Sequence, residues 1–223
     1  FVTNKNIRNI IGQSESAFNF RKVMDEGKIL LINLSKGKIG EENSNFLGLV
    51  LVPKILIAAM SRQDMPKDER RDFFLYVDEF QNFATPDFAQ ILSEARKYKL
   101  NLIVANQFIG QMEEDVKNAI FGNVGSVVSF RVGVTDANYL QHEFQPVFTE
   151  ADLINVERFN TYVKTIVSGE PVTPFSMDLT RDLSREKAMA NPRVAELIRE
   201  LSRLKYGRDV IEVEAEIVKR ARL

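Results

Sequence analysis

The chain has 223 residues, 44% of them hydrophobic and 27% charged, which indicates a globular protein with one main core rather than a disordered or fibrous chain. Its 30 basic and 31 acidic residues give a net charge of −1, which excludes a global attraction to nucleic acid, so any DNA contact must be local. Zero cysteines exclude disulfides, thiolate metal sites and a cysteine nucleophile, and suit a reducing compartment.

No membrane span or signal peptide is predicted. The longest apolar block, Phe46 to Met60, contains Pro53 and Lys54 and falls short of the roughly 18 uninterrupted apolar residues that a span needs. Because the chain opens on Phe1 in mid-pattern, we interpret it as a piece of a longer protein. The single histidine, His142, lies in a helical-looking stretch and is assigned no role.

The first half of the chain alternates apolar runs of strand length with helical patterns. In chain order, the sequence predicts a short helix at 16–27, a strand buried on both faces at 28–34, a loop at 35–40, a long buried helix at 44–62, a charged connector at 63–71, a second buried strand at 73–77, a helix at 86–98 and a third strand at 100–105.

The alternation continues in the second half. The patterns predict a helix at 113–121, a strand at 126–132, helices at 136–144 and 150–156, and a possible antiparallel hairpin of two late strands at 161–167 and 172–179. Strands that alternate with helices in this way predict an α/β fold, with a mostly parallel sheet and helices on both of its faces.

A helical tail follows Thr180, where the composition shifts to charged helical stretches at 184–190, 192–206 and 210–222. We therefore divide the chain into a main domain, 1–180, and a tail, 181–223. One face of the second tail helix carries an apolar stripe formed by Val194, Leu197, Ile198, Leu201 and Leu204. We expect the stripe to pack against the main domain; a dedicated partner site is the alternative.

An acidic pair, Asp78-Glu79, directly follows the apolar run 73–77 and forms a Walker B-type pattern. A parallel sheet collects its ligand site at the carboxyl ends of its strands, so carboxylates at this position point into that crevice. Asp78 would hold the shell of a magnesium ion, and Glu79 would orient and polarise the attacking water. Taken alone the pattern is weak, because a strand that ends in two acids is often a solvated turn or a helix cap.

An amide pair, Asn106-Gln107, follows the next predicted strand and falls at the same edge of the sheet. A glutamine there can bond a γ-phosphate oxygen and the lytic water. The alternative is a helix-capping Asn106 followed by a surface Gln107.

Two arginines are further candidates. Arg96 lies at the end of the predicted helix 86–98, where a cation complements the helix dipole, and spacing alone favours this structural role over contact with a phosphate. Arg131 lies near the end of the strand 126–132, where a charged side chain is usually solvated or paired but can also line a nucleotide crevice.

No phosphate-binding P-loop is present in the sequence. The motif needs Gly-x-x-x-x-Gly-Lys-Ser/Thr, but Gly27-Lys28 and Gly37-Lys38 are the only Gly-Lys pairs and isoleucine follows each of them. The chain therefore lacks the half of a nucleotide site that cradles the phosphates.

The motifs together resemble the TraG/TraD-like coupling proteins of type IV secretion and conjugation, over residues from about 6 to 179. The resemblance rests on the segments 8–13, 34–37, 75–84, 93–98, 105–107, 122–125 and 130–133, which read RNIIGQ, LSKG, LYVDEFQNFA, SEARKY, ANQ, GNVG and FRVG. This family is part of the HerA/FtsK group of RecA-like P-loop motors, so the resemblance implies the carboxy-terminal part of a RecA-like ATPase core.

The resemblance also implies roles and partners. It implies a Walker B role for Asp78 and Glu79 and the role of the motif-three glutamine for Gln107. It also implies that Arg96 is an arginine finger that acts on a neighbouring subunit's nucleotide. The resemblance gives less support to a role for Arg131. ATP and Mg²⁺ are the implied cofactors. The implied partners are DNA, a relaxase or DNA-processing complex, secretion-channel components and five further copies in a hexameric ring. The implied location is the cytoplasmic face of the inner membrane, reached through an upstream region.

Three alternatives remain open from the sequence. One is a non-catalytic, ATPase-like recognition module that binds DNA-processing or channel components. Another is a HerA/FtsK-type translocase of chromosomal DNA, which would share the same motifs. The third is a magnesium-dependent nuclease that uses Asp78, Glu79 and Glu94.

Overall fold

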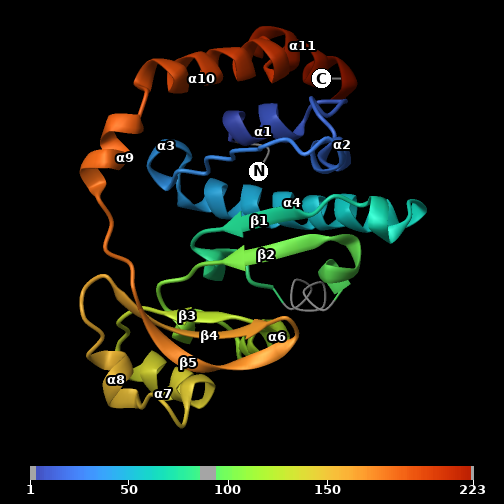
Figure 1. Cartoon of the computed structure of the whole chain (residues 1–223). Coiled ribbons are helices and arrows are strands. Elements are labelled where there is room, and N and C mark those ends of the chain that lie inside the picture. Colours follow the sequence, from blue (N-terminus) through green and yellow to red (C-terminus); the bar gives the residue numbers. More distant parts are fainter. Residues whose placement is uncertain (1–3, 86–93, 222–223) are drawn as a thin grey trace. The chain divides into compact units, whose positions relative to one another are not determined.

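The computed structural model describes residues 4–85 and 94–221, and the chain divides into two compact units (Figure 1). The first unit comprises 1–74, 97–101 and 188–223, and the second comprises 75–96 and 102–187.

Four amino-terminal helices build the first unit: α1 (Lys5–Ile11), α2 (Phe20–Asp25), α3 (Lys36–Ile39) and α4 (Glu41–Met60). The long helix α4 buries Leu47, Val52, Ile55, Leu56 and Ala59, and α2 packs against it. Asparagine side chains cap α1 and α2, which satisfies backbone N–H groups that a helix start leaves without partners.

The last two helices of the tail, α10 (Pro192–Tyr206) and α11 (Val210–Ala221), belong to this unit. The first tail helix, α9 (Leu183–Met189), begins in the second unit, which ends at residue 187. Helix α11 packs against α1, where Asn9 donates to Glu214 at 3.0 Å and Val213 is buried. The ring of Tyr206 makes an edge contact with Phe18 at a centroid distance of 5.7 Å. The predicted boundary at residue 180 stays a prediction.

A fully buried arginine, Arg62, joins distant segments of the first unit. It lies in a short 3-10 helix, η1 (Ser61–Asp64), and its Nε is 3.0 Å from a carboxylate oxygen of Asp25. Its guanidinium also donates to the carbonyls of Arg71 at 2.6 Å and Tyr98 at 3.0 Å. Burial lowers the pKa of Arg62, so this charge depends on its partners for compensation.

Two strands, β1 (Phe73–Val77) and β2 (Leu100–Val104), form a parallel pair. Phe73 N donates to Lys99 O and Ala105 N donates to Val77 O, each at 2.9 Å, so partner numbers rise together along both strands. The carboxyl ends of both strands therefore meet at one edge, in the second unit.

The second unit also contains an antiparallel sheet of β3 (Val127–Ser129), β4 (Asn160–Val167) and β5 (Glu170–Asp178), in that order. A two-residue turn joins β4 and β5, with φ of 53° at Ser168 and 90° at Gly169, the positive values of a type I′ hairpin. Helices α6 (Glu114–Asn123), α7 (Val134–Phe144) and α8 (Glu150–Ile154) complete this unit, whose core includes Ala137, Leu140, Phe144 and Leu153.

The predicted α/β class is confirmed, and helix or strand occurs where most of the patterns place it. Residues 86–93 of the helix predicted at 86–98 lie outside the described residues. The strand predicted at 126–132 is shorter and pairs in the antiparallel sheet. The loop predicted at 35–40 contains the single-turn helix α3.

The strand predicted at 28–34 is wrong. This segment has no strand pairing within the described residues, and Ile29 and Leu31 are 89% and 84% exposed. A strand exists only when a neighbour accepts its backbone hydrogen bonds, and an apolar run cannot show whether that neighbour is present.

The stretch Glu41–Asp64 is long and apolar enough to cross a membrane by length and composition alone, because Pro53 does not interrupt α4. The core helix of a soluble protein meets the same criterion, and seven residues of α4 are buried, so this finding is weak evidence for a span.

Candidate functional site

The acidic pair lies at the carboxyl end of β1, held against the end of β2 by backbone hydrogen bonds. Ala105 N donates to Val77 O, and Phe80 N donates to Ala105 O, both at 2.9 Å. These bonds are made by the residues on either side of the acidic pair, Val77 and Phe80, and they place Asp78 and Glu79 beside the side-chain amides that follow β2. The structure thus brings Asp78, Glu79 and Gln107 to one edge of the parallel pair.

Glu79 has a left-handed backbone conformation, with φ 50° and ψ 43°. Non-glycine residues adopt this region at a cost, and such residues cluster at functional sites. Two contacts hold the conformation: Asp78 Oδ1 accepts from Glu79 N at 3.0 Å, and Asn82 Nδ2 donates to Glu79 O at 3.0 Å. The sharp turn directs the half-buried Glu79 side chain away from the line of the strand.

Each carboxylate oxygen of Glu79 accepts a hydrogen bond from a glutamine amide. Gln81 Nε2 donates to one oxygen at 2.6 Å, and Gln107 Nε2 donates to the other. We call Asp78, Glu79, Gln81 and Gln107 the acid–amide cluster. Each oxygen of a carboxylate has a second lone pair, so Glu79 retains capacity to accept a bond from a water.

Asp78 fits a role at a solvated cation. Its side chain is exposed, and only one of its oxygens is used by the Glu79 N–H. Among residues 4–85 and 94–221, no group of three or more His, Cys, Asp or Glu side chains could hold a metal. A cation held through water by one aspartate and by nucleotide phosphates fits this arrangement. The carboxylate cluster of the nuclease alternative, with Glu94, is not assembled.

Arg96 begins the 3-10 turn η4 (Arg96–Tyr98), and its side chain is exposed. The turn itself is tightly held: Arg70 donates to Lys97 O at 2.7 Å and lies 5.6 Å from the ring centre of Tyr98. In the part of the chain that the structure describes, Arg96 makes no ion pair, and its role as an arginine finger stays a prediction.

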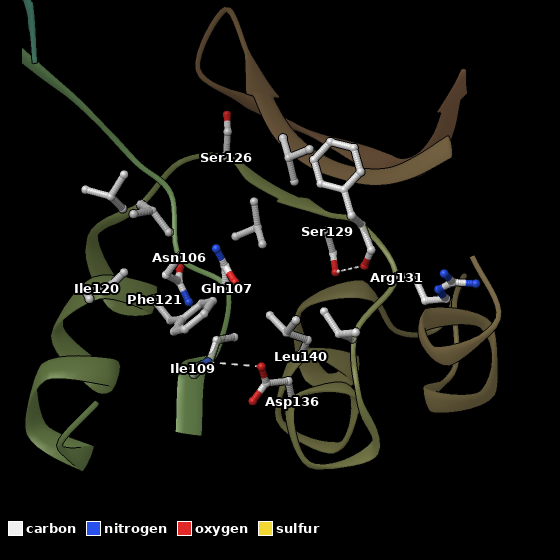
Figure 2. A pocket seen from close by; sticks show the side chains of 16 residues that line it. Asn106, Gln107, Ile109, Ile120, Phe121, Ser126, Ser129, Arg131, Asp136 and Leu140 are labelled. Carbon is white, nitrogen blue, oxygen red and sulfur yellow. Dashed lines mark hydrogen bonds between the residues drawn. The ribbon is translucent and has the colours of Figure 1, made fainter. Parts of the chain in front are cut away.

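A pocket of about 440 Å³ lies next to the acid–amide cluster. Figure 2 shows Asn106 and Gln107 near its middle, between Phe121 of α6 and Ser129 of β3. Arg131 lies at the opposite rim with its guanidinium pointing away from the amides. The structure therefore places Arg131 on the pocket wall but does not join it to Glu79 through any contact among the described residues.

Asp136 is a site residue that the sequence reasoning missed. Its side chain is 3% exposed, and its two oxygens accept from Ile109 N at 3.0 Å and Gly110 N at 3.3 Å. The first of these bonds is drawn in Figure 2. Asp136 thus fixes the turn that begins two residues after Gln107. An acid in the first turn of a helix was visible in the sequence, but its bond to a distant loop was not.

Residues 72–142, which contain Asp78, Glu79, Arg96, Gln107 and Arg131, match the family model described as the TraM recognition site of TraD and TraG. The predicted resemblance to TraG/TraD-like coupling proteins is confirmed. None of the curated proteins compared matches the chain.

Solved structures of a coupling protein are similar in fold. A trigonal form of the bacterial conjugative coupling protein TrwBdeltaN70 in complex with sulphate is 16% identical, with a TM-score of 0.50, over 74% of this chain and 44% of that one. Plasmid coupling protein TrwB in complex with the GTP analogue GDPNP is 17% identical, with a TM-score of 0.48, over 63% and 39%. The chain thus spans less than half the length of these proteins.

Proposed function

We propose that this chain is part of an ATP-driven DNA-translocating motor of the coupling-protein type, which delivers DNA or DNA–protein substrates to a type IV secretion or conjugation channel. The observation that carries the proposal is the acid–amide cluster, in which Glu79 and Gln107 are hydrogen-bonded at the adjoining ends of two parallel strands. The family match over residues 72–142 supports the same assignment.

In this proposal each side chain of the cluster has a separate role. Asp78 would hold the water shell of Mg²⁺, and Glu79 would accept a hydrogen bond from the attacking water and orient it. Gln107 would exchange its bond to Glu79 for bonds to a γ-phosphate oxygen and the water, so its amide would report the state of the nucleotide to the loop that follows β2.

Bound MgATP would supply the phosphoanhydride bond and the charge neutralisation of its phosphates. The cluster fits this ligand on one side only, because no phosphate cradle of the P-loop type occurs in the sequence. We therefore propose that residues upstream in a longer protein supply the P-loop, and that the chain by itself does not turn over ATP. Arg96 would contact the nucleotide of a neighbouring subunit in a hexamer, and Arg131 would line the crevice.

The test uses the longer protein that contains this chain. We expect Glu79→Gln to reduce ATP hydrolysis by about 10²–10³-fold, because the amide cannot accept a proton or polarise the water as a carboxylate does. Binding of a non-hydrolysable ATP analogue should be unchanged, since Glu79 does not hold the phosphates. Turnover assays and calorimetry measure the two quantities.

Glu69→Gln is the matched control, because Glu69 is an exposed carboxylate four residues before β1 and outside the cluster. This variant should hydrolyse ATP at the wild-type rate. Full turnover by Glu79→Gln would contradict the assignment of Glu79.

The partners of the proposed motor are DNA, components of the relaxase or DNA-processing complex and components of the secretion channel. We place it at the cytoplasmic face of the inner membrane, to which only a region upstream of this chain would attach it. A HerA/FtsK-type translocase of chromosomal DNA would use the same cluster. DNA-stimulated turnover together with binding of relaxase-complex proteins would favour the conjugative role.

A second candidate is a recognition module without hydrolysis, and the description of the matched family as a TraM recognition site favours it. In this case residues 72–142 would bind a component of the DNA-processing complex. Absence of a P-loop from the full gene, together with no ATP turnover in the presence or absence of DNA, would favour this candidate over the motor.

A further inference from the structure

The tail helix α10 presents an apolar stripe that the structure leaves exposed. Its five residues, Val194, Leu197, Ile198, Leu201 and Leu204, are 47–85% exposed. The prediction that the stripe packs against the main domain is therefore wrong. Monomeric proteins rarely expose large contiguous apolar patches, so an exposed stripe of this kind indicates a surface that a partner covers.

The helix that carries the stripe is already formed. Asn191 caps its amino terminus by accepting from Val194 N at 3.2 Å, and Pro192 occupies the first turn. At the other end, Tyr206 packs against Phe18. A binding partner would meet a preformed, anchored helix and would not have to pay for helix nucleation.

The spacing of the stripe is that of a two-stranded coiled coil. Val194 and Leu201 occupy the a positions of two successive heptads, and Leu197 and Leu204 occupy the d positions. Val194, which is β-branched, at the first a position and leucine at both d positions favour two parallel strands, whereas Leu201 at the second a position adds no such preference. Ile198, at e, widens the apolar surface on one side.

The charges beside the stripe complement a second copy in parallel. Glu200 occupies a g position and Lys205 the following e position, the two places that face each other across a parallel pair. Two such Glu–Lys pairs form by symmetry. In an antiparallel pair with the same overlap, Glu200 lies nearest to Glu200 of the other copy, and like charges repel.

Neither charge is neutralised within the described part of the chain, although the Lys205 ammonium lies 5.3 Å from the ring centre of Tyr206. Among the described residues neither Glu200 nor Lys205 has an ion-pair partner, whereas Arg199, on the opposite face of α10, pairs with Glu196 at 2.9 Å. We propose that α10 is a self-association surface, and that two copies of the chain pair through it in parallel and in register. The proposal does not depend on ATP hydrolysis or on the role of Glu79.

The first test is the mass of the purified chain, measured by sedimentation over a range of concentrations. We expect the 25.5 kDa chain to approach twice that mass as concentration rises. Leu201→Glu should keep it monomeric, because the change buries a carboxylate in the pair. A wild-type chain that stays monomeric at every concentration, with the stripe serving another partner or a membrane, would overturn the proposal.

A charge exchange tests the parallel register. Glu200→Lys and Lys205→Glu should each weaken the dimer, because each sets like charges face to face, and the double variant should restore it. Arg203→Glu is the matched control for Lys205→Glu: it makes the same charge change near the helix end but lies off the stripe. The proposed register would be contradicted if Lys205→Glu and Arg203→Glu weakened the dimer equally, or if the double variant did not restore it.

The absence of cysteine allows a direct geometric test. Leu204→Cys should form an intermolecular disulfide under mild oxidation, because a d position meets its own copy in a parallel pair. Arg203→Cys, equally exposed but off the stripe, is the control. Cross-linking only in a mixture of Val194→Cys and Leu204→Cys chains would show an antiparallel pair and overturn the proposal.

Discussion

At the scale of single residues, the acid–amide cluster depends on a carboxylate that is not part of it. Burying the charge of Asp136 is costly unless hydrogen bonds compensate for it, and the two backbone N–H groups after Gln107 do so. The carboxylate also accepts hydrogen bonds from the backbone N–H groups of this turn, which are not paired with a neighbouring strand among the described residues. These two hydrogen bonds therefore both compensate for the burial of the Asp136 side chain and hold the turn in place.

We expect Asp136→Ala to lower the free energy of unfolding by about 1–3 kcal/mol, the cost of leaving buried backbone donors without partners. Asp136→Asn should lose less, because its remaining carbonyl oxygen still accepts one bond. Urea unfolding followed by circular dichroism measures both. Asp115→Ala, an exposed aspartate on α6, is the control and should change stability by less than about 0.5 kcal/mol. Equal losses for Ala at 136 and 115 would contradict this role.

The sequence predicts part of the acid–amide cluster, and the reason is the geometry of strands. Asp78, Glu79 and Gln107 each follow a strand pattern directly, so a parallel pairing alone brings them to one edge. Gln81 and Asp136 reach the same place through the left-handed turn at Glu79 and the packing of α7. Both depend on tertiary structure, which periodicity does not report.

At the scale of elements, the packing of α11 on the amino-terminal segment includes a carboxylate contact, from Ser14 to Glu216, that depends on pH. Glu216 accepts from the Ser14 hydroxyl and from Arg208, the latter at 2.8 Å. These bonds lower the pKa of Glu216 from 4.5 to about 2, and the bond from Ser14 has the largest effect. Because the folded pKa lies below the unfolded one, the ionised carboxylate stabilises the docked helix above pH 4.5.

This contribution should disappear as the pH falls from about 4.5 to about 2, the interval between the unfolded and folded pKa values of Glu216. We expect Glu216→Gln to lower the melting temperature at pH 6 and to have a smaller effect at each lower pH within this interval. Thermal unfolding of both proteins across the series measures the difference. Glu212→Gln, an exposed change on the same helix, should show no such trend. A difference that is independent of pH would contradict the assignment.

Local patterns predict elements well where the element satisfies its own backbone or has its partner close in sequence. Helix α10 has the predicted bounds because Asn191, Pro192 and Gly207 mark its ends. The β4–β5 hairpin follows from a short turn with glycine. The segment 28–34 and the stripe of α10 have equally clear patterns, but an apolar face does not reveal which surface covers it or whether that surface belongs to the same chain.

At the scale of the whole molecule, the proposed role of Arg96 would divide the site between neighbouring subunits. Glu79 and Gln107 lie together in one chain, whereas the exposed Arg96 has no ion pair among the described residues. If Arg96 completes a neighbour's site, a subunit without Glu79 can still supply an arginine, and a subunit without Arg96 can still supply a carboxylate. Defects in the two residues should then compensate each other in a mixed ring.

We therefore consider two single variants of the longer protein, one with Glu79→Gln and one with Arg96→Ala. Each should be inactive alone, and a mixture of the two should regain part of the wild-type ATP turnover. Interfaces that combine Glu79 of one subunit with Arg96 of the next are intact, and in random mixing they form at about a quarter of the junctions, because each subunit type is half of the total. Steady-state hydrolysis across a series of mixing ratios measures the recovery. A protein with both changes, mixed with either single variant, is the control and should restore nothing. Absence of recovery from a confirmed mixed ring would place Arg96 in its own subunit's site.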